Sequence, residues 1–443
     1  MLTAGAASAI ITPPVGTAME GYSARADVSQ GVHDDLHARA IVIDDGATAV
    51  AIVSCDLVGV DRRLVAEARD RASQATGIPA EHVLIAATHT HAGPAGLRRD
   101  LDDALLDVTA RHIAGAIATA HKSRREAVLK VGAATVDSVS QNRRHPDWPV
   151  DASMFALLLD DPDPLRPPIA AAVNFSCHAT VLYHTNLLLS ADYPGYAVRT
   201  VESLFPGLGG LFLNGACGNV NPAWVRQEFE EAERVGTIVG AAAARLIGEL
   251  RPLGVGQKAH NIRWDEHIDK PVTSGELVDV RLRVASRRVE LPVKSFLAPE
   301  EYEASVAELE ARAAAATDRE ERRRAMEQAT RLRTERTVAQ RMVGQQGRTL
   351  HPELMAISFG PGVALLGLPG EFFVETVADI RAQAGLRYLP VACYANHYVG
   401  YVVPHEAYAQ GGYEAGVTLL APEAEAIAKA EALSLRREVA AGA

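Results

Sequence analysis

Short apolar runs rich in β-branched residues alternate with helical stretches along most of this chain. Residues 37–44 and 48–55 are typical of two strands joined by a turn at Asp45-Gly46, a dipeptide that favours hairpins. Helices are expected over 62–75, 104–121 and 225–250, and further strands near 82–88, 152–160, 169–177, 354–367 and 389–394. Such interleaving predicts α/β layers, with the loops at strand ends available for a functional site.

Residues 297–345 differ in composition from the rest of the chain. The segment is rich in Ala, Glu and Arg, and it has no glycine before Gly344 and no proline after Pro299. We expect it to form a helical hairpin that projects from the body. The charges at 319–324 are typical of a solvated face, and an oligomer contact or a lid over the site are the alternatives.

Charge and hydropathy exclude several classes of partner. The 44 basic and 55 acidic residues give a formal charge of −11, which disfavours nucleic acid, because binding to phosphates needs a basic surface. No run of about 18 apolar residues is present, so we expect no membrane span. The N-terminus has no basic stretch before its apolar part, which argues against a secretory signal. The four cysteines are far apart and form no C-x-x-C pair, so buried free thiols and a cytoplasmic location are expected.

Two histidines follow the strand predicted at 82–88. The segment 88–94 reads Thr-His-Thr-His-Ala-Gly-Pro, so His89 and His91 are two residues apart. In extended backbone, residues at this spacing point to the same side. We therefore expect both imidazoles in one pocket, one as a metal ligand and the other beside it.

A third histidine and one carboxylate complete a candidate metal site. His178 ends the strand predicted at 169–177, and Glu371 follows Pro369-Gly370 among apolar residues. An anion in such surroundings needs a cationic partner, because burying an unpaired charge is costly. Two imidazoles and a carboxylate, with one position left open, are the ligand set of catalytic zinc.

Two further segments have both a structural and a functional interpretation. The Gly/Asn-rich turn at 215–222, which includes Asn221, is either a tight turn or a source of hydrogen-bond donors to a reacting carbonyl. The tyrosines of 394–413 are either amphipathic packing residues or donors to a metal or an oxyanion.

Together these segments resemble the neutral/alkaline (non-lysosomal) ceramidase family. The resemblance runs from about Ala4 to about Ala421, and it also includes residues 19–22, 31–40 and 190–196. It implies one catalytic domain over 1–443, with layered mixed β-sheets flanked by helices and the 297–345 hairpin inserted into it. The chain departs from the family in ending at Ala443, whereas ceramidases continue into a C-terminal immunoglobulin-like domain, so we expect no such domain here.

The resemblance assigns roles to particular positions of this sequence. It implies zinc ligands at His89, His178, Glu371 and Tyr401, and an active-site hydrogen-bonding role for His91. Tyr413, twelve residues after Tyr401, corresponds to a second catalytic tyrosine, and the pair Asn142-Arg143 to one whose arginine contacts substrate.

One position departs from the family pattern in a way that affects the chemistry. The family's active-site serine is replaced by Asn221, which is not a nucleophile, so no acyl-serine forms at this position. The expected nucleophile is therefore a water activated by zinc. His91 or Asp192 is expected to carry the proton, and Tyr413, Arg143 and Asn221 to stabilise the oxyanion.

The expected function is zinc-dependent hydrolysis of an amide C–N bond in a small soluble substrate. The alternatives are an ester or lactone hydrolase with the same site, a true ceramidase, or an inactive metal-containing protein that binds a ligand. We expect neither nucleic acid nor membrane as a partner, and we leave a homo-oligomer open.

Overall fold

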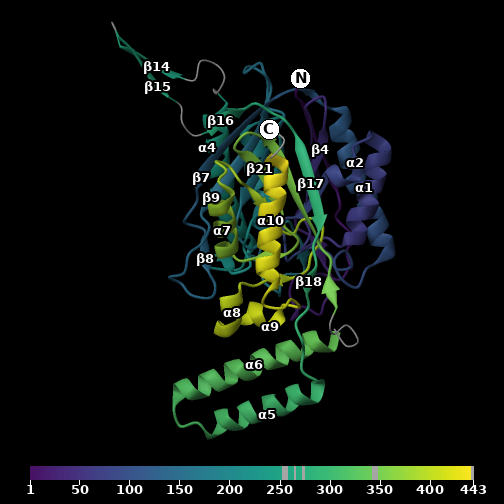
Figure 1. Ribbon diagram of the computed structural model, residues 1–443, viewed down its shortest axis with the longest axis vertical. Coiled ribbons are helices and arrows are strands. Elements are labelled where there is room, and N and C mark those ends of the chain that lie inside the picture. Colours follow the sequence, from purple (N-terminus) through teal and green to yellow (C-terminus); the bar gives the residue numbers. More distant parts are fainter. Residues whose placement is uncertain (252–257, 264–265, 272–274, 342–347, 441–443) are drawn as a thin grey trace.

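The N-terminal third of the chain forms a five-stranded sheet covered by two helices. The computed structural model describes residues 1–251, 258–263, 266–271, 275–341 and 348–440. The strand order is β5 (Val83–Ala87), β4 (Ala49–Cys55), β3 (His37–Asp44), β1 (Thr3–Ile10) and β6 (Arg125–Glu126). Strands β4 and β5 are parallel and the other neighbours are antiparallel. Helices α1 (Arg62–Thr76) and α2 (Asp103–Lys122) pack on its outer face (Figure 1).

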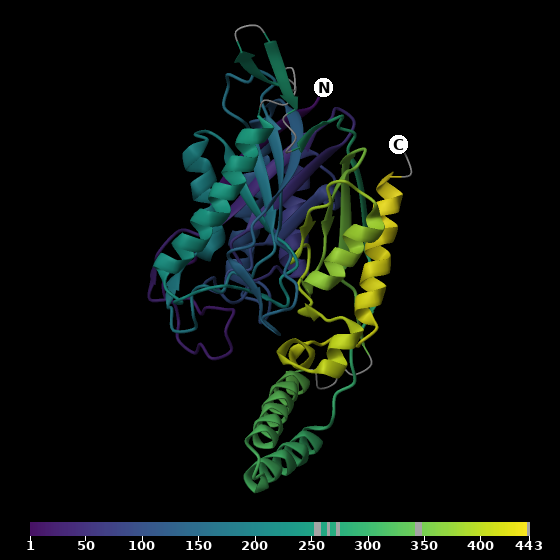
Figure 2. The ribbon, with the colours of Figure 1, turned by 90° about the vertical axis from the view of Figure 1, so that its left-hand side faces the viewer.

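A second and a third sheet follow along the chain. The second has the order β12 (Gly209–Asn214), β10 (Ala170–Phe175), β9 (Ser153–Asp160), β7 (Val128–Thr135) and β16 (Gly275–Val278). The third has the order β17 (Arg283–Arg288), β20 (Glu353–Gly360), β21 (Val363–Gly367) and β23 (Val391–Ala392). Helices α3 (Asp192–Leu204) and α4 (Phe229–Leu250) cover the second sheet, and α7 (Val374–Ala384) and α10 (Ala424–Ala440) cover the third (Figure 2).

The inner faces of the three sheets meet in one apolar core. On β4, Val50 and Ile52 face this central core, whereas Ala51 and Val53 face α1 and α2. Strands β9, β10, β20 and β21 divide their side chains between two cores in the same way. Because both faces of these strands are buried, their sequences are nearly continuous apolar runs. The predicted α/β fold of layered mixed sheets flanked by helices is confirmed.

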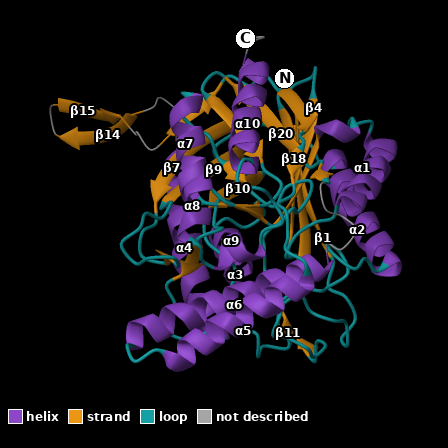
Figure 3. Ribbon diagram, turned by 60° about the horizontal axis from the view of Figure 1, so that its bottom comes forward, coloured by secondary structure: helices purple, strands orange, loops and turns teal. Residues whose placement is uncertain are grey.

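Two helices of the 297–345 segment pack against each other and project from the body. These are α5 (Pro299–Ala315) and α6 (Arg319–Arg341), shown in green in Figures 1 and 2, while residues 342–345 lie outside the described residues. Helix α6 contacts α9 (Tyr413–Val417), which follows α8 (His405–Gln410) (Figure 3). Among the described helices, none has the length and apolar character needed to cross a membrane.

Short strands and one 3₁₀ turn lie in the connections between the larger elements. They are β2 (Gly31–Val32), β8 (Ser140–Asn142), β11 (Leu188–Leu189), β13 (Val220–Pro222), β14 (Lys258–Arg263), β15 (Glu266–Pro271), β18 (Leu291–Pro292), β19 (Thr349–Leu350), β22 (Glu371–Phe372), β24 (Tyr401–Val402) and the 3₁₀ turn Ala80–His82. The pairs β8–β13 and β22–β24 matter most for the site, because they carry candidate site residues or lie directly beside them.

Candidate metal centre

His89 lies at the carboxyl end of β5 in a left-handed backbone conformation. Its φ is 68°, a value that few residues other than glycine adopt. The backbone N–H of His89 donates to the carbonyl of Leu57 over 2.9 Å, and its Nδ1 lies 2.6 Å from the carbonyl of Val58. A carbonyl only accepts, so Nδ1 carries the proton and Nε2 presents a bare lone pair.

His178 follows β10 and is oriented by the same kind of contact. Its Nδ1 lies 2.5 Å from the carbonyl of Cys217 and 3.2 Å from that of Val220, so Nε2 is again the bare nitrogen. Burial and the nearby charge of Arg143 lower the pKa of His178 to about 4. The imidazole is therefore neutral at neutral pH, and its Nε2 is an acceptor.

Glu371 on β22 points its carboxylate at both bare nitrogens. Its Oε2 lies 3.1 Å from Nε2 of His178 and 3.6 Å from Nε2 of His89, and its Oε1 accepts a hydrogen bond from the hydroxyl of Tyr398. Burial alone would raise the pKa of Glu371, and only positive charge at the two ring nitrogens, carried by a protonated imidazole or by a bound cation, lowers that pKa. Because only 2% of the residue is exposed, the Glu371 anion needs such a charge beside it.

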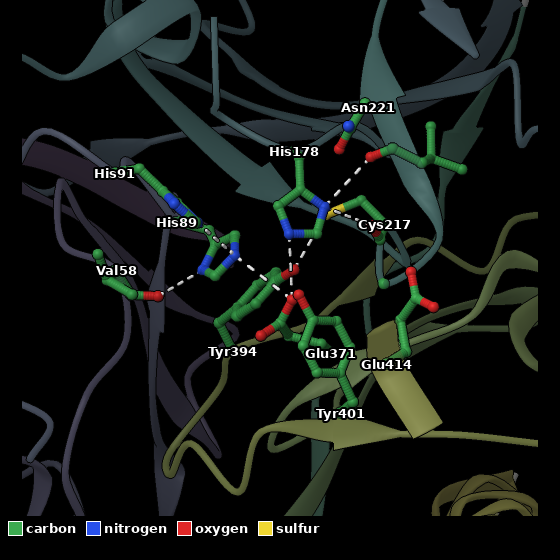
Figure 4. Close-up of polar contacts among 12 residues, drawn as sticks. Val58, His89, His91, His178, Cys217, Asn221, Glu371, Tyr394, Tyr401 and Glu414 are labelled. Atoms are coloured by element: carbon green, nitrogen blue, oxygen red, sulfur yellow. Dashed lines mark hydrogen bonds and ion pairs between the residues drawn. The ribbon is translucent and has the colours of Figure 1, made fainter. Parts of the chain in front are cut away.

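These three groups fit a metal ion. Nε2 of His178 and Oε2 of Glu371 are buried and have no hydrogen-bond partner among the described residues. Figure 4 shows His89, His178 and Glu371 converging on one point from different elements. Acceptor atoms that face one another without a donor need a cation between them, and two imidazoles with a carboxylate are typical ligands of zinc.

His91 lies beside this group. Its Nε2 is 3.2 Å from Nε2 of His89, and its Nδ1 is buried without a hydrogen-bond partner among the described residues. One ring nitrogen from each of His89, His91 and His178 falls within a group whose members all lie within 4.8 Å of one another, so three imidazoles are an alternative donor set. The rings of His89 and His91 thus lie side by side as expected, but His89 is left-handed and not extended, so the expected strand geometry is not the cause.

The two tyrosines assigned by the resemblance also lie at the centre. Tyr401 pairs with Glu371 across β22 and β24, and its hydroxyl lies 3.0 Å from Nη2 of Arg143. Burial raises the pKa of Tyr401, and the charge of Arg143 opposes that rise. The ring of Tyr413 is 5.9 Å from that of Tyr401, and Tyr413 is 60% exposed. Tyr413 therefore lies where the centre opens to solvent.

Arg143 connects the turn at Gly218 with helix α9. It donates from Nε to Glu414 over 2.7 Å and from Nη2 to the carbonyl of Gly218 over 2.6 Å. Its Nη1 lies 3.5 Å from Oδ1 of Asn221. Arg143 and Asn221 therefore adjoin each other beside the metal centre, as Figure 4 shows for Asn221 and His178.

Asp192 lies at the start of α3 and is fully buried. Its carboxylate accepts hydrogen bonds from the backbone N–H groups of Leu182 and Tyr193, over 3.0 and 2.5 Å. Burial raises the pKa of Asp192 to about 7. These contacts hold the backbone at 182, and the role of Asp192 as a proton carrier stays a prediction.

Sequence reasoning missed several residues that shape the centre. The ring of Tyr394 stacks on His89 with centroids 4.0 Å apart, and Tyr398 binds Glu371. Glu414 accepts hydrogen bonds from both Arg143 and Arg144. The clustering of tyrosines at 394–413 was the available signal for the first two, but the sequence holds no sign of which ring meets which ligand.

Comparison with known proteins points to one family. The family model described as neutral/alkaline non-lysosomal ceramidase, N-terminal, matches residues 3–210. Neutral ceramidase of Pseudomonas aeruginosa is 25% identical over 466 residues, which cover 92% of this chain and 67% of that protein. Neutral ceramidase of Drosophila melanogaster is 28% identical over 247 residues, which cover 48% of this chain and only 35% of that protein.

The fold is also similar to that of a solved structure. The crystal structure of the Pseudomonas aeruginosa neutral ceramidase superposes with a TM-score of 0.74 at 21% identity, covering 98% of this chain and 74% of that one. A structure described as ceramidase complexed with C2 gives a TM-score of 0.74 at 20% identity. At these identities the superpositions show a shared fold.

Proposed function

Because this chain belongs to the neutral/alkaline non-lysosomal ceramidase family, we propose that it is a zinc-dependent hydrolase that cleaves an amide bond. The observation that carries this proposal is the set of facing acceptors, namely the bare Nε2 atoms of His89 and His178 and the Oε2 atom of Glu371. A zinc ion there would supply Lewis acidity, which activates a water molecule and polarises the scissile carbonyl.

The groups around the centre have distinct proposed roles. His89, His178 and Glu371 hold the ion, and Tyr401 is the proposed fourth ligand, with its hydroxyl against Arg143. His91 has one ring nitrogen against His89 and a second without a partner among the described residues, so it is placed to accept and return a proton.

Oxyanion stabilisation falls to the donors on the solvent side. The guanidinium of Arg143 and the amide of Asn221 adjoin each other there, and the Tyr413 hydroxyl is a third candidate. Asn221 carries no nucleophilic oxygen, so we propose direct attack by water without an acyl-enzyme at this position. An ester or lactone needs the same groups and is the second candidate substrate.

The test of this proposal combines metal analysis with a substrate panel. Purified full-length protein should contain about one zinc per chain by emission spectrometry. It should also hydrolyse at least one amide among N-acyl ethanolamines, N-acyl amino acids and ceramide in detergent, with esters and lactones assayed alongside. Cleavage of esters alone would favour the second candidate, and zinc-loaded protein with no hydrolysis of any substrate would contradict enzymatic function.

The ligand assignment has its own test. His89→Ala, His178→Ala and Glu371→Ala should each lose most of the bound zinc, because a three-ligand site seldom tolerates the loss of one ligand. His112→Ala, at an exposed position of α2, is the matched control and should retain zinc. A full equivalent of zinc in the His89→Ala, His178→Ala double variant would refute the site.

A further inference from the structure

The solvent side of the metal centre holds more arginine than acid. Arg143 and Arg144 share a single carboxylate, Glu414, at 2.7 and 2.9 Å, and Arg98 pairs with Glu20. The side chain of Glu414 is only 3% exposed, so water screens this cluster weakly. Glu371 faces the proposed metal, and apart from it two guanidinium groups share one carboxylate, which leaves a surplus positive charge next to the proposed reaction site.

Arg143 presents that charge toward the opening. Its Cζ lies 5.4 Å from the ring of Tyr401 and 5.7 Å from the ring of the exposed Tyr413. Its side chain is 19% exposed, and its Nη1 has only the 3.5 Å contact with Asn221 among the described residues. Part of the guanidinium can therefore donate to a ligand without breaking the ion pair to Glu414.

Arg98 and Arg99 add positive charge near Tyr398, and Arg99 also does so near Tyr413. The Cζ of Arg98 lies 4.4 Å from the ring of Tyr398, and Arg99 is exposed beside it in the chain. Burial and Glu371 raise the pKa of Tyr398, and the charges of Arg98 and Arg99 oppose that rise. Partial removal from water and Glu371 likewise raise the pKa of Tyr413, and Arg143 and Arg99 oppose it. The arginines thus act on the hydroxyl of Tyr398, which binds Glu371, and on that of the exposed Tyr413.

This local charge runs against the character of the whole chain, whose formal charge is −11. A positive opening in a negative protein attracts anions to that one place and disfavours cations there. We propose that the substrate of the amide hydrolysis inferred above is an anion that carries a carboxylate near the scissile bond, bound by Arg143 with Asn221 and attracted by Arg99. A guanidinium and a carboxylate form strong, charge-assisted hydrogen bonds.

The experiment compares amides of matched size and different charge. N-hexanoylglycine carries a carboxylate on the amine side, and the N-ethyl monoamide of adipic acid carries one on the acyl side. N-hexanoylethanolamine is neutral, and N-hexanoylethylenediamine is cationic. We expect kcat/KM for at least one anionic amide to exceed that for the neutral amide by roughly 10- to 100-fold, the usual scale for hydrogen bonds to a charged group.

Variants of the exposed Arg99 distinguish electrostatic attraction of the substrate from an effect of this side chain on packing. Arg99→Gln should lower kcat/KM for the preferred anion roughly threefold, with little effect on the neutral amide, and Arg99→Lys should restore it. Arg245→Gln, which removes an exposed charge from α4, is the matched control and should change neither substrate. Added salt should reduce the rate for the anion and leave that for the neutral amide unchanged.

The outcomes distinguish this inference from the proposed function. If the neutral or cationic amide is cleaved as well as both anions, the inference is overturned while amide hydrolysis stands. Equal effects of Arg99→Gln and Arg245→Gln would likewise overturn the role of Arg99. If no amide of any charge is cleaved by zinc-loaded protein, the proposed function itself fails.

Discussion

Two histidines from different sheets present a bare nitrogen by the same means. Nδ1 of His89 bonds to a backbone carbonyl 31 residues away, and Nδ1 of His178 to one 39 residues away. Backbone carbonyls fix the tautomer of a neutral ring without adding a charge, and in that tautomer each Nε2 atom is an acceptor. Which ring nitrogen of each histidine faces the metal site therefore depends on main-chain geometry as well as on the residue type.

The first prediction concerns Asn221. If its amide binds the developing oxyanion, Asn221→Ala should lower kcat by roughly 10²-fold with zinc retained, the usual loss for one oxyanion donor. Steady-state kinetics and metal analysis of the same preparation measure both effects. Unchanged kinetics would make Asn221 a turn residue, and an acyl-enzyme trapped by mass spectrometry would contradict direct attack by water.

The second prediction concerns Asp192, whose pKa is raised to about 7 by burial. The pKa of an aspartic acid in the unfolded chain is about 3.9, so the folded state binds this proton more tightly than the unfolded state does. The protonated side chain therefore stabilises the fold fully below about pH 3.9, and this contribution is lost as the pH rises to about 7. The free energy of unfolding of the wild type, minus that of Asp192→Asn, should therefore fall between pH 4.5 and 7 and then level off. Urea unfolding across this range measures it, and a difference that rises with pH would contradict the assignment.

At the scale of elements, helix α9 lies between the metal centre and the hairpin. On its inner side Glu414 binds Arg143 and Arg144, and on its outer side Lys294 donates to the carbonyls of Ala415 and Gly416 over 3.0 and 3.2 Å. Helix α6 contacts α9, as Figure 3 shows. The hairpin therefore supports the segment that carries Tyr413.

The third prediction tests that support at Gly416. A Cβ added there would lie 3.2 Å from Cγ of Arg331 on α6, so the Arg331 side chain, or the two helices with it, must give by a few tenths of an ångström. Gly416→Ala should lower kcat/KM roughly three- to tenfold with zinc retained, because small displacements of catalytic groups are costly. Kinetic parameters with metal content measure this.

A matched control exists on α4. A Cβ at Gly248 meets no atom within 4 Å, so Gly248→Ala should leave kcat/KM unchanged. It should raise the free energy of unfolding by about 0.5–1 kcal/mol, the usual gain for Gly→Ala in a helix. Unchanged kinetics in Gly416→Ala as well would mean that the hairpin does not position Tyr413.

At the scale of the whole molecule, the two histidine ligands and Glu371 each follow a strand of a different large sheet, with Glu371 itself in the short β22. His89 follows β5 of the first sheet, His178 follows β10 of the second, and Glu371 follows β21 of the third. A metal bound by these residues links three layers of the fold.

The fourth prediction follows from that linkage. Removal of zinc by a chelator should lower the free energy of unfolding by about 4 kcal/mol if the free ion is present at about 1,000 times its dissociation constant. Calorimetry with and without chelator measures the change, and added zinc should reverse it. In the His89→Ala, His178→Ala double variant the chelator should have no effect, and an equal effect there would place the stabilising metal elsewhere.

The sequence alone determined the layered α/β fold and the elements that carry the candidate ligands. Strands buried on both faces are continuous apolar runs, and His89 and His178 follow the ends of β5 and β10 by two and three residues. The sequence also singled out Glu371, and the family resemblance, now supported by the comparisons, added Tyr401 to that group. These features are local in the chain, and a local pattern is readable without a structure.

Only the tertiary structure decided how those residues meet. The carbonyls that orient His89 and His178, the contact of Tyr398 with Glu371 and the sharing of Glu414 by two arginines all join segments far apart in the chain. No periodicity or motif encodes which distant atoms adjoin, because that depends on how three sheets pack around one core. For the same reason, the surplus of positive charge at the opening is invisible in a chain whose formal charge is −11.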